Sequence, residues 1–126
     1  QMKVLDKRVS SRRSNHAYYK SHLECDSISF LKEQEGYFSN RWLSCVLTNS
    51  LRSREKIRTA LINNNIEARP LWKPMHKQPV FKKYPAFTNG VSEELFEKGL
   101  CLPSGSNLTS KDLDSIILII KENIDD

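Results

Sequence analysis

A proline-rich segment at residues 66–81 limits what this chain can fold into. Its sixteen residues hold three prolines, a tryptophan, a histidine, an arginine and two lysines. Each proline fixes φ, removes a backbone donor and biases the preceding residue toward extended geometry. The segment therefore predicts a stiff, extended loop that presents cationic and aromatic side chains, and such loops commonly carry binding sites.

Composition indicates one folded domain. The chain has 126 residues, of which 38% are hydrophobic and 28% are charged. No apolar run approaches the roughly 20 residues that span a bilayer, and the basic N-terminus lacks the apolar stretch of a signal peptide. Cys25, Cys45 and Cys101 are widely spaced without a CxxC pattern, which argues against a zinc site. We expect buried, reduced thiols at Cys45 and Cys101, and a cytoplasmic protein.

Periodicity and capping signals predict alternating helices and short strands. The expected helices are 2–23, 54–62 with Ser53 as cap, 92–98 with Ser92 as cap, and one that begins after Thr109 with a Thr109/Asp112 capping box. The expected extended segments are 42–48, 66–71 and 100–102, and a helical turn is expected at 78–83. This order predicts an α/β fold of the two-layer α+β kind, with about three strands, helices on one side and a long N-terminal helix.

The proline-rich segment supplies most candidate binding residues. His76 suits a hydrogen bond to a phosphate or sugar hydroxyl, with Lys73 nearby, or it is a surface histidine. Arg69 could hold a phosphate or carboxylate, or form an ion pair with a neighbouring acid. Trp72 could stack on a nucleobase or sugar, or anchor the loop. Asn40 could reach a site at the sheet edge.

Other polar and aromatic residues have plainer interpretations. Trp42 is expected in the core, and His16 and His22 on the surface of the first helix. No nucleophile motif, phosphate-binding loop or paired acid/base group is recognisable, so we predict no catalytic residue within the chain. The long helix has a thin apolar stripe and no capping residue before it, which indicates part of a longer protein.

The net positive charge is compatible with a second function. The net charge is +5, and residues 1–20 carry six Lys or Arg against one Asp. A small basic nucleic-acid-binding domain is therefore the alternative hypothesis. Against it, no helix-turn-helix, KH, zinc or RNP signature is present, and the basic residues do not gather on one predicted helix face.

Two motifs carry a family resemblance. Residues 69–76, followed by Gln78-Pro79-Val80-Phe81, resemble the C-terminal part of the DegT/DnrJ/EryC1/StrS family of pyridoxal-phosphate-dependent sugar aminotransferases. Residues 91–106 form the second matching stretch, and residues 5–13 resemble the helix that enters the family's small domain. The nearest branch acts on UDP-linked 4-keto-6-deoxy amino sugars for bacterial surface polysaccharides or glycans.

The resemblance implies the small domain of a fold type I aminotransferase. It implies a long linking helix at residues 1–25 and a small domain at 26–126. It further implies a homodimer, a UDP-sugar substrate, a glutamate amino donor, and pyridoxal 5'-phosphate bound by a large domain upstream of residue 1. None of the lysines at 73, 77, 82 and 83 matches the family's Schiff-base motif, so the chain alone is expected to be inactive and to hold no cofactor ligand. His76, Arg69 and Trp72 match the family segment that approaches the substrate.

Overall fold

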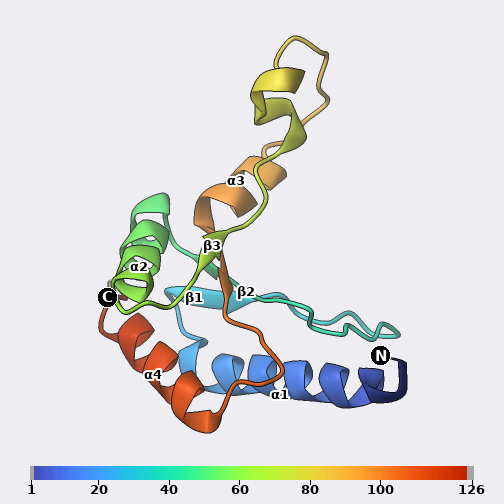
Figure 1. Ribbon diagram of the computed structural model, residues 1–126. Coiled ribbons are helices and arrows are strands. Elements are labelled where there is room, and N and C mark those ends of the chain that lie inside the picture. Colours follow the sequence, from blue (N-terminus) through green and yellow to red (C-terminus); the bar gives the residue numbers. More distant parts are fainter. Residues whose placement is uncertain (1, 125–126) are drawn as a thin grey trace.

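Four antiparallel strands form a single sheet in the computed structural model, which describes residues 2–124 (Figure 1). The strands are β1 (Ile28–Phe30), β2 (Ser44–Thr48), β3 (Arg69–Pro70) and β4 (Gly99–Leu102), in the spatial order β1-β2-β4-β3. The fold class is confirmed, and the sheet has one strand more than the roughly three that the sequence predicted. The sequence-based prediction missed β1, which is only three residues long and pairs with β2.

The predicted helices are present with shifted starts. They are α1 (Leu5–Leu23) after a short turn η1 (Met2–Val4), α2 (Leu51–Asn63), α3 (Val91–Lys98) and α4 (Ser110–Lys121). Ser50 rather than Ser53 caps α2, because the Ser50 side chain accepts a hydrogen bond from the Ser53 amide. Gly90 rather than Ser92 precedes α3. The capping box of Thr109 and Asp112 is confirmed on α4.

Helices α1, α2 and α4 cover one face of the sheet and enclose the core. Alternate residues of β2 are buried, so Val46 points into this layer while Cys45 points to the opposite face. The core joins residues from all three helices and from the sheet: Tyr19, Leu23, Ile28, Phe30, Val46, Ile57, Leu61, Ala68, Leu100, Leu102, Leu113, Ile116, Ile117 and Ile120. The expectation of helices on one side is confirmed for these three helices.

His16 is buried, contrary to the surface position expected from the sequence. Its ring packs edge-on against Phe30 with centroids 5.5 Å apart, and the residue is 7% exposed. The connection between β1 and β2 runs back along α1 and adds cover that a helical pattern alone does not reveal (Figure 1). Arg13 fastens this connection through two hydrogen bonds of 2.9 Å to the Glu33 carboxylate.

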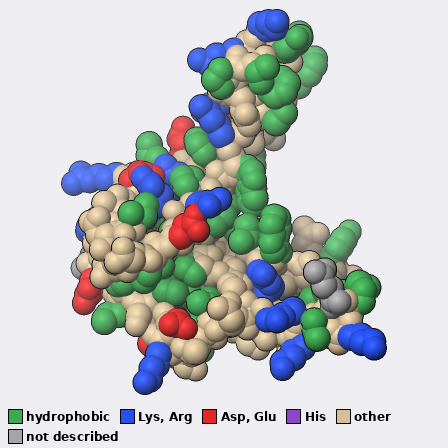
Figure 2. Space-filling view, viewed as in Figure 1, with side chains coloured by type: hydrophobic (Ala, Val, Ile, Leu, Met, Phe, Trp, Pro, Cys, Tyr) green, Lys and Arg blue, Asp and Glu red, His purple; other side chains and the backbone are tan. Residues whose placement is uncertain are grey.

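An arm of residues 72–90 projects from the body between β3 and α3 (Figure 1). It contains two short 3-10 helices, η2 (Met75–Lys77) and η3 (Pro79–Phe81). The predicted turn at 78–83 is thus confirmed, and η2 adds a second one. Hydrophobic side chains gather on this arm and at its base (Figure 2). Those exposed along it are Trp72, Met75, Val80, Phe81, Tyr84 and Phe87.

Candidate functional site

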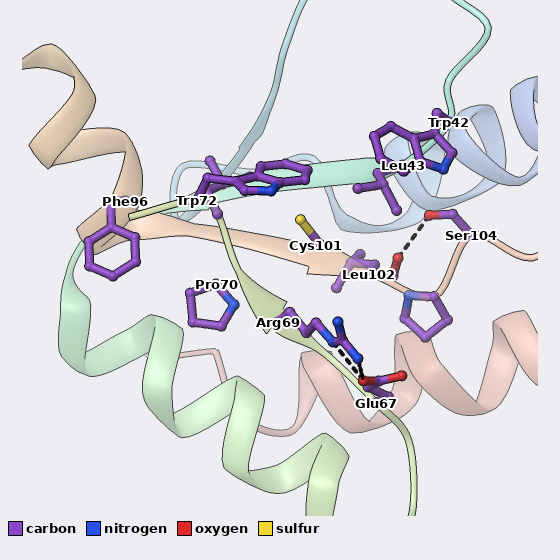
Figure 3. A pocket seen from close by; sticks show the side chains of 12 residues that line it. Trp42, Leu43, Glu67, Arg69, Pro70, Trp72, Phe96, Cys101, Leu102 and Ser104 are labelled. Carbon is purple, nitrogen blue, oxygen red and sulfur yellow. Dashed lines mark hydrogen bonds and ion pairs between the residues drawn. The ribbon is translucent and has the colours of Figure 1, made fainter. Parts of the chain in front are cut away.

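A cleft of about 790 Å³ lies on the face of the sheet that α1, α2 and α4 leave open, at the base of the arm (Figure 3). Strands β3 and β4 supply its floor, the start of the arm supplies one wall, and the segment before β2 supplies another. The lining residues are Trp42, Leu43, Glu67, Arg69, Pro70, Leu71, Trp72, Phe96, Cys101, Leu102, Pro103 and Ser104. Most of these side chains are apolar, which is typical of a ligand-binding cleft.

Two tryptophans dominate the cleft. The ring centroids of Trp42 and Trp72 are 6.2 Å apart and the planes are tilted by 38°. Trp42 is 62% exposed and Trp72 is 66% exposed, so both rings present open faces. The prediction that Trp42 belongs to the core is wrong, since β2 begins only at Ser44.

Local backbone geometry explains how Trp42 reaches the open face. Arg41 adopts a positive φ of 49°, an uncommon conformation for a residue with a side chain. The Asn40 side chain accepts a hydrogen bond of 3.0 Å from the Trp42 amide, as asparagine does in tight turns. Asn40 itself does not line the cleft, so the structure gives it a part in positioning Trp42.

Arg54 on α2 fixes the aromatic ring at the far end of the cleft. Its buried guanidinium donates a 3.2 Å hydrogen bond to the Phe96 carbonyl and lies 5.8 Å from the Phe96 ring centroid. The same guanidinium pairs with Glu55 at 2.9 Å. Arg54 therefore links α2 to α3 and sets the position of Phe96. No sequence motif pointed to Arg54.

Hydrogen bonds also fix the segment that follows β4. The Ser104 hydroxyl accepts a 2.7 Å bond from the Ser44 amide and donates a 2.8 Å bond to the Leu102 carbonyl. The Tyr19 hydroxyl donates to the Pro103 carbonyl at 3.0 Å. Burial raises the pKa of Tyr19, so this hydroxyl stays protonated and remains a donor. This side of the cleft is consequently rigid.

Arg69 lies on the cleft floor beside a carboxylate. Its Nε donates a 2.6 Å hydrogen bond to Glu67, and a second guanidinium nitrogen also contacts that carboxylate. The ion pair that the sequence left as the alternative for Arg69 is therefore present. The Arg69 side chain is 76% exposed, and an exposed pair of this kind exchanges partners at small cost. A ligand anion can compete with Glu67 for the guanidinium.

Two of the five predicted binding residues line the cleft and three do not. Arg69 and Trp72 are lining residues, whereas Lys73 is exposed at the start of the arm. His76 lies on η2, where its Nε2 is 2.6 Å from a carboxylate oxygen of Glu93 on α3. This pair ties the arm to α3. His76 is thus outside the hydrophobic core, but it does not point into this cleft.

The apolar and aromatic lining suits the cleft to binding. No lysine is among its lining residues in the described part of the chain, so these residues do not fit pyridoxal phosphate, which binds covalently to a lysine amine. Lys77 forms an ion pair with Glu97 at 3.8 Å, and Lys73, Lys82 and Lys83 are exposed. Within residues 2–124 no three His, Cys, Asp or Glu side chains gather as metal ligands, and no helix is long and apolar enough to cross a membrane.

Sequence comparison with known proteins identifies a family and two relatives. The profile of the DegT/DnrJ/EryC1/StrS aminotransferase family matches residues 1–121. The chain is 42% identical over 127 aligned positions to EpsN of Bacillus subtilis (strain 168), a protein assigned by name as a pyridoxal phosphate-dependent aminotransferase. It is 28% identical over 123 positions to GDP-perosamine synthase of Escherichia coli O157:H7. These alignments cover 95% and 97% of this chain, but only 32% and 33% of the relatives.

A solved structure shares the fold. The aminotransferase TlmJ from Streptoalloteichus hindustanus superposes with a TM-score of 0.87 at 20% identity, over 98% of this chain and 33% of that protein. The chain therefore spans about a third of the length of the relatives it matches.

Proposed function

The chain belongs to the DegT/DnrJ/EryC1/StrS aminotransferase family, and from this premise we propose that it is the small domain of a pyridoxal-phosphate-dependent sugar aminotransferase. In the complete protein, an amino group would pass from glutamate to a nucleotide-linked 4-keto-6-deoxy sugar, for bacterial surface polysaccharide or glycan synthesis. The nucleic-acid-binding alternative is not carried further, because the family profile covers almost the whole chain.

We propose that the cofactor binds to a part of the protein outside this chain. Within the chain, residues 1–25 would form a linking helix and residues 26–126 a small domain. Residues 1, 125 and 126 lie outside the described part of the structure. The complete enzyme is proposed to be a cytoplasmic homodimer that uses a UDP-linked sugar. The name of the Escherichia coli relative indicates a GDP-linked sugar for that protein, so both nucleotides belong in the test.

The observation that carries the proposal is the paired indole surface of Trp42 and Trp72 above Arg69. Indole faces pack against the C–H face of a sugar or stack on a base, and a guanidinium can hold a pyrophosphate with two hydrogen bonds. These residues would bind and orient the substrate. We propose that Lys73 and His76, which lie on the arm outside the cleft, contact the part of the substrate that extends beyond it, and that Asn40 acts by holding Trp42.

The test uses the complete protein with its cofactor bound. UDP-linked and GDP-linked 4-keto-6-deoxy sugars are each mixed with L-glutamate, and formation of 2-oxoglutarate is followed. Trp72→Ala should raise KM for the keto sugar by about tenfold and change kcat less, because aromatic stacking contributes about 1–3 kcal/mol per ring. The matched control is Leu118→Ala, an exposed apolar residue on α4, which should leave KM unchanged.

Two results would count against the proposal at different levels. Absence of 2-oxoglutarate with every keto sugar tried would remove the proposed activity. Full activity with an unchanged KM in Trp72→Ala would keep the activity but remove the cleft from substrate binding.

A further inference from the structure

Cys45 and Cys101 lie directly opposite each other on the open face of the sheet. They are register partners in the antiparallel pair of β2 and β4, and their Sγ atoms are 3.7 Å apart. Cys101 is buried but lines the cleft, with 9% of its surface exposed, and Cys45 is half-buried beside it. Cys25 is exposed and belongs to the turn that follows α1. The chain therefore contains one close thiol pair and one separate thiol.

We propose that Cys45 and Cys101 are a redox-active dithiol, a modification site that closes to a disulfide when it meets a peroxide. This site does not depend on the proposed aminotransferase activity. Its chemistry follows from the register of two neighbouring strands and from access through the cleft.

The backbone geometry allows the bond to form without a change of fold. Residues directly opposite in an antiparallel pair have Cα atoms about 4.5–5.5 Å apart, which falls within the range of about 4.4–6.8 Å found in disulfides. The sulfur atoms need to approach from 3.7 Å to the disulfide length of about 2.05 Å. Rotation of the two side chains and a small approach of their β-carbons supply this movement, since β2 and β4 are already paired.

The two thiols share a hydrogen bond and differ in their access to the cleft. The Cys45 thiol lowers the pKa of Cys101 by stabilising its thiolate, whereas that bond and burial raise the pKa of Cys45. We assign Cys101 as the thiol that reacts first, because it lines the cleft, and Cys45 beside it as the resolving thiol. An arrangement with one favoured thiolate beside a second thiol is the usual composition of a reversible redox site.

The reaction balances with hydrogen peroxide as oxidant. The Cys101 thiolate attacks one peroxide oxygen, the O–O bond breaks, and the departing hydroxide takes up a proton to become water. Cys45 sulfur then attacks the resulting sulfenic acid, the S–O bond breaks, and a second water leaves with the Cys45 proton. The two sulfurs lose two electrons in total, and the peroxide gains them.

Peptide mapping of the complete protein provides the test. The protein is treated with hydrogen peroxide, its remaining thiols are alkylated, and it is digested with trypsin. Cleavage after Arg41, Arg52, Lys98 and Lys111 puts Cys45 in peptide 42–52 and Cys101 in peptide 99–111, while Cys25 falls in peptide 21–32. We expect peptides 42–52 and 99–111 to be joined, with a mass two hydrogens below their sum, and to separate after reduction.

Folding should accelerate the link, because the fold holds the thiols at high effective concentration. The joined pair should form at least about tenfold faster in native protein than in urea-unfolded protein at the same peroxide concentration. Cys25→Ser should leave the link unchanged. Cys45→Ser should leave Cys101 as a sulfenic acid that dimedone captures.

The proposal is overturned if both cysteines remain alkylated after peroxide treatment of the native protein. It is also overturned if the link forms equally fast in unfolded protein. Because both outcomes are read on the unmodified sequence, the test holds even where Cys45→Ser fails to fold.

Discussion

The burial of His16 leads us to expect that the stability of this chain depends on pH. Burial is the largest cause that lowers the pKa of His16, and the positive charges of Arg41, Lys20 and Arg13 lower it further, while Glu33 acts in the opposite direction. The unfolded chain therefore binds a proton at His16 more readily than the folded chain does.

We expect the contribution of neutral His16 to the free energy of unfolding to be complete above about pH 7. This contribution should decrease as the pH falls through 6.5 toward the lower folded pKa of His16. Urea unfolding at about pH 8 and about pH 5.5 measures this change. The neutral variant His16→Gln should lose less stability over the same interval. An equal loss in both proteins would contradict the assignment to His16.

Residue patterns predicted part of the candidate site. The prolines and aromatic residues around Arg69 and Trp72 identified two lining residues, since stiff extended segments leave such side chains exposed. The core position predicted for Trp42 was wrong, because the sequence of an apolar run does not reveal whether a given side chain faces the core or the solvent. Its orientation depends on the positive φ of Arg41, which sequence periodicity does not encode.

At the scale of elements, the C-terminal helix α4 has a defined start. Thr109 accepts a 3.3 Å hydrogen bond from the Asp112 amide, and the Asp112 carboxylate accepts a 2.7 Å bond from the Thr109 amide. The bond from the Thr109 amide, followed by a 2.7 Å bond that the Thr109 hydroxyl donates to the same carboxylate, lowers the pKa of Asp112. Helix α4 carries four core residues, so its start matters to the whole helix layer.

Thr109→Ala should lower the free energy of unfolding by about 1 kcal/mol, because it removes a side-chain cap. Chemical denaturation at neutral pH measures the change. Ser110→Ala, an exposed position one residue later, is the matched control and should stay within about 0.5 kcal/mol of the parent. Equal effects of the two variants would show that the capping box does not stabilise α4.

The arm depends on few contacts with the body. His76 on η2 bonds Glu93 on α3 at 2.6 Å, and Lys77 pairs with Glu97 on the same helix at 3.8 Å. None of the residues within η2 or η3 is buried. Sparse burial of this kind is typical of segments that open locally without global unfolding.

His76→Ala should therefore increase the rate of tryptic cleavage within the arm by severalfold, at Lys77, Lys82 or Lys83, without a matching loss of global stability. Limited proteolysis followed by mass spectrometry identifies the cleaved bonds. The reference variant is His22→Ala, which changes an exposed histidine on α1. Equal arm cleavage in both variants would mean that the His76–Glu93 pair does not hold the arm.

Elements with local signals were the ones that sequence predicted well. The capping box of α4 and the long run of α1 depend on nearby residues alone. Strand β1 was missed because three residues do not display a period, and its existence depends on pairing with β2. The predicted cap of α2 at Ser53 lies three residues too late, because the Ser50 side chain accepts a hydrogen bond from the Ser53 amide and the helix begins at Leu51.

The whole molecule shows why the cleft could not be assembled from sequence. Its walls come from the segment before β2, the base of the arm and the end of α3, which are distant along the chain. Only the pairing of β4 with both β2 and β3 brings them together. Arg54 is a clear case, because nothing in its local sequence indicates that it holds Phe96.

Gly99 is the point where these parts meet. It ends α3, begins β4, and accepts a 3.2 Å hydrogen bond from the Leu71 amide at the base of the arm. A β-carbon at Gly99 would overlap the Leu71 side chain and the Leu95 carbonyl. The close approach of three segments thus requires the absence of a side chain here.

Gly99→Ala should cost about 1–3 kcal/mol of unfolding free energy, since overpacking forces the neighbouring atoms apart. Gly105→Ala is the matched control, because its β-carbon would meet chiefly the movable end of the Asn107 side chain, and it should cost less. Urea titration of both variants gives the comparison. Adding Leu71→Ala to Gly99→Ala should relieve only part of the strain, because the overlap with the Leu95 carbonyl involves backbone. Full recovery would show that the side-chain overlap alone sets the cost.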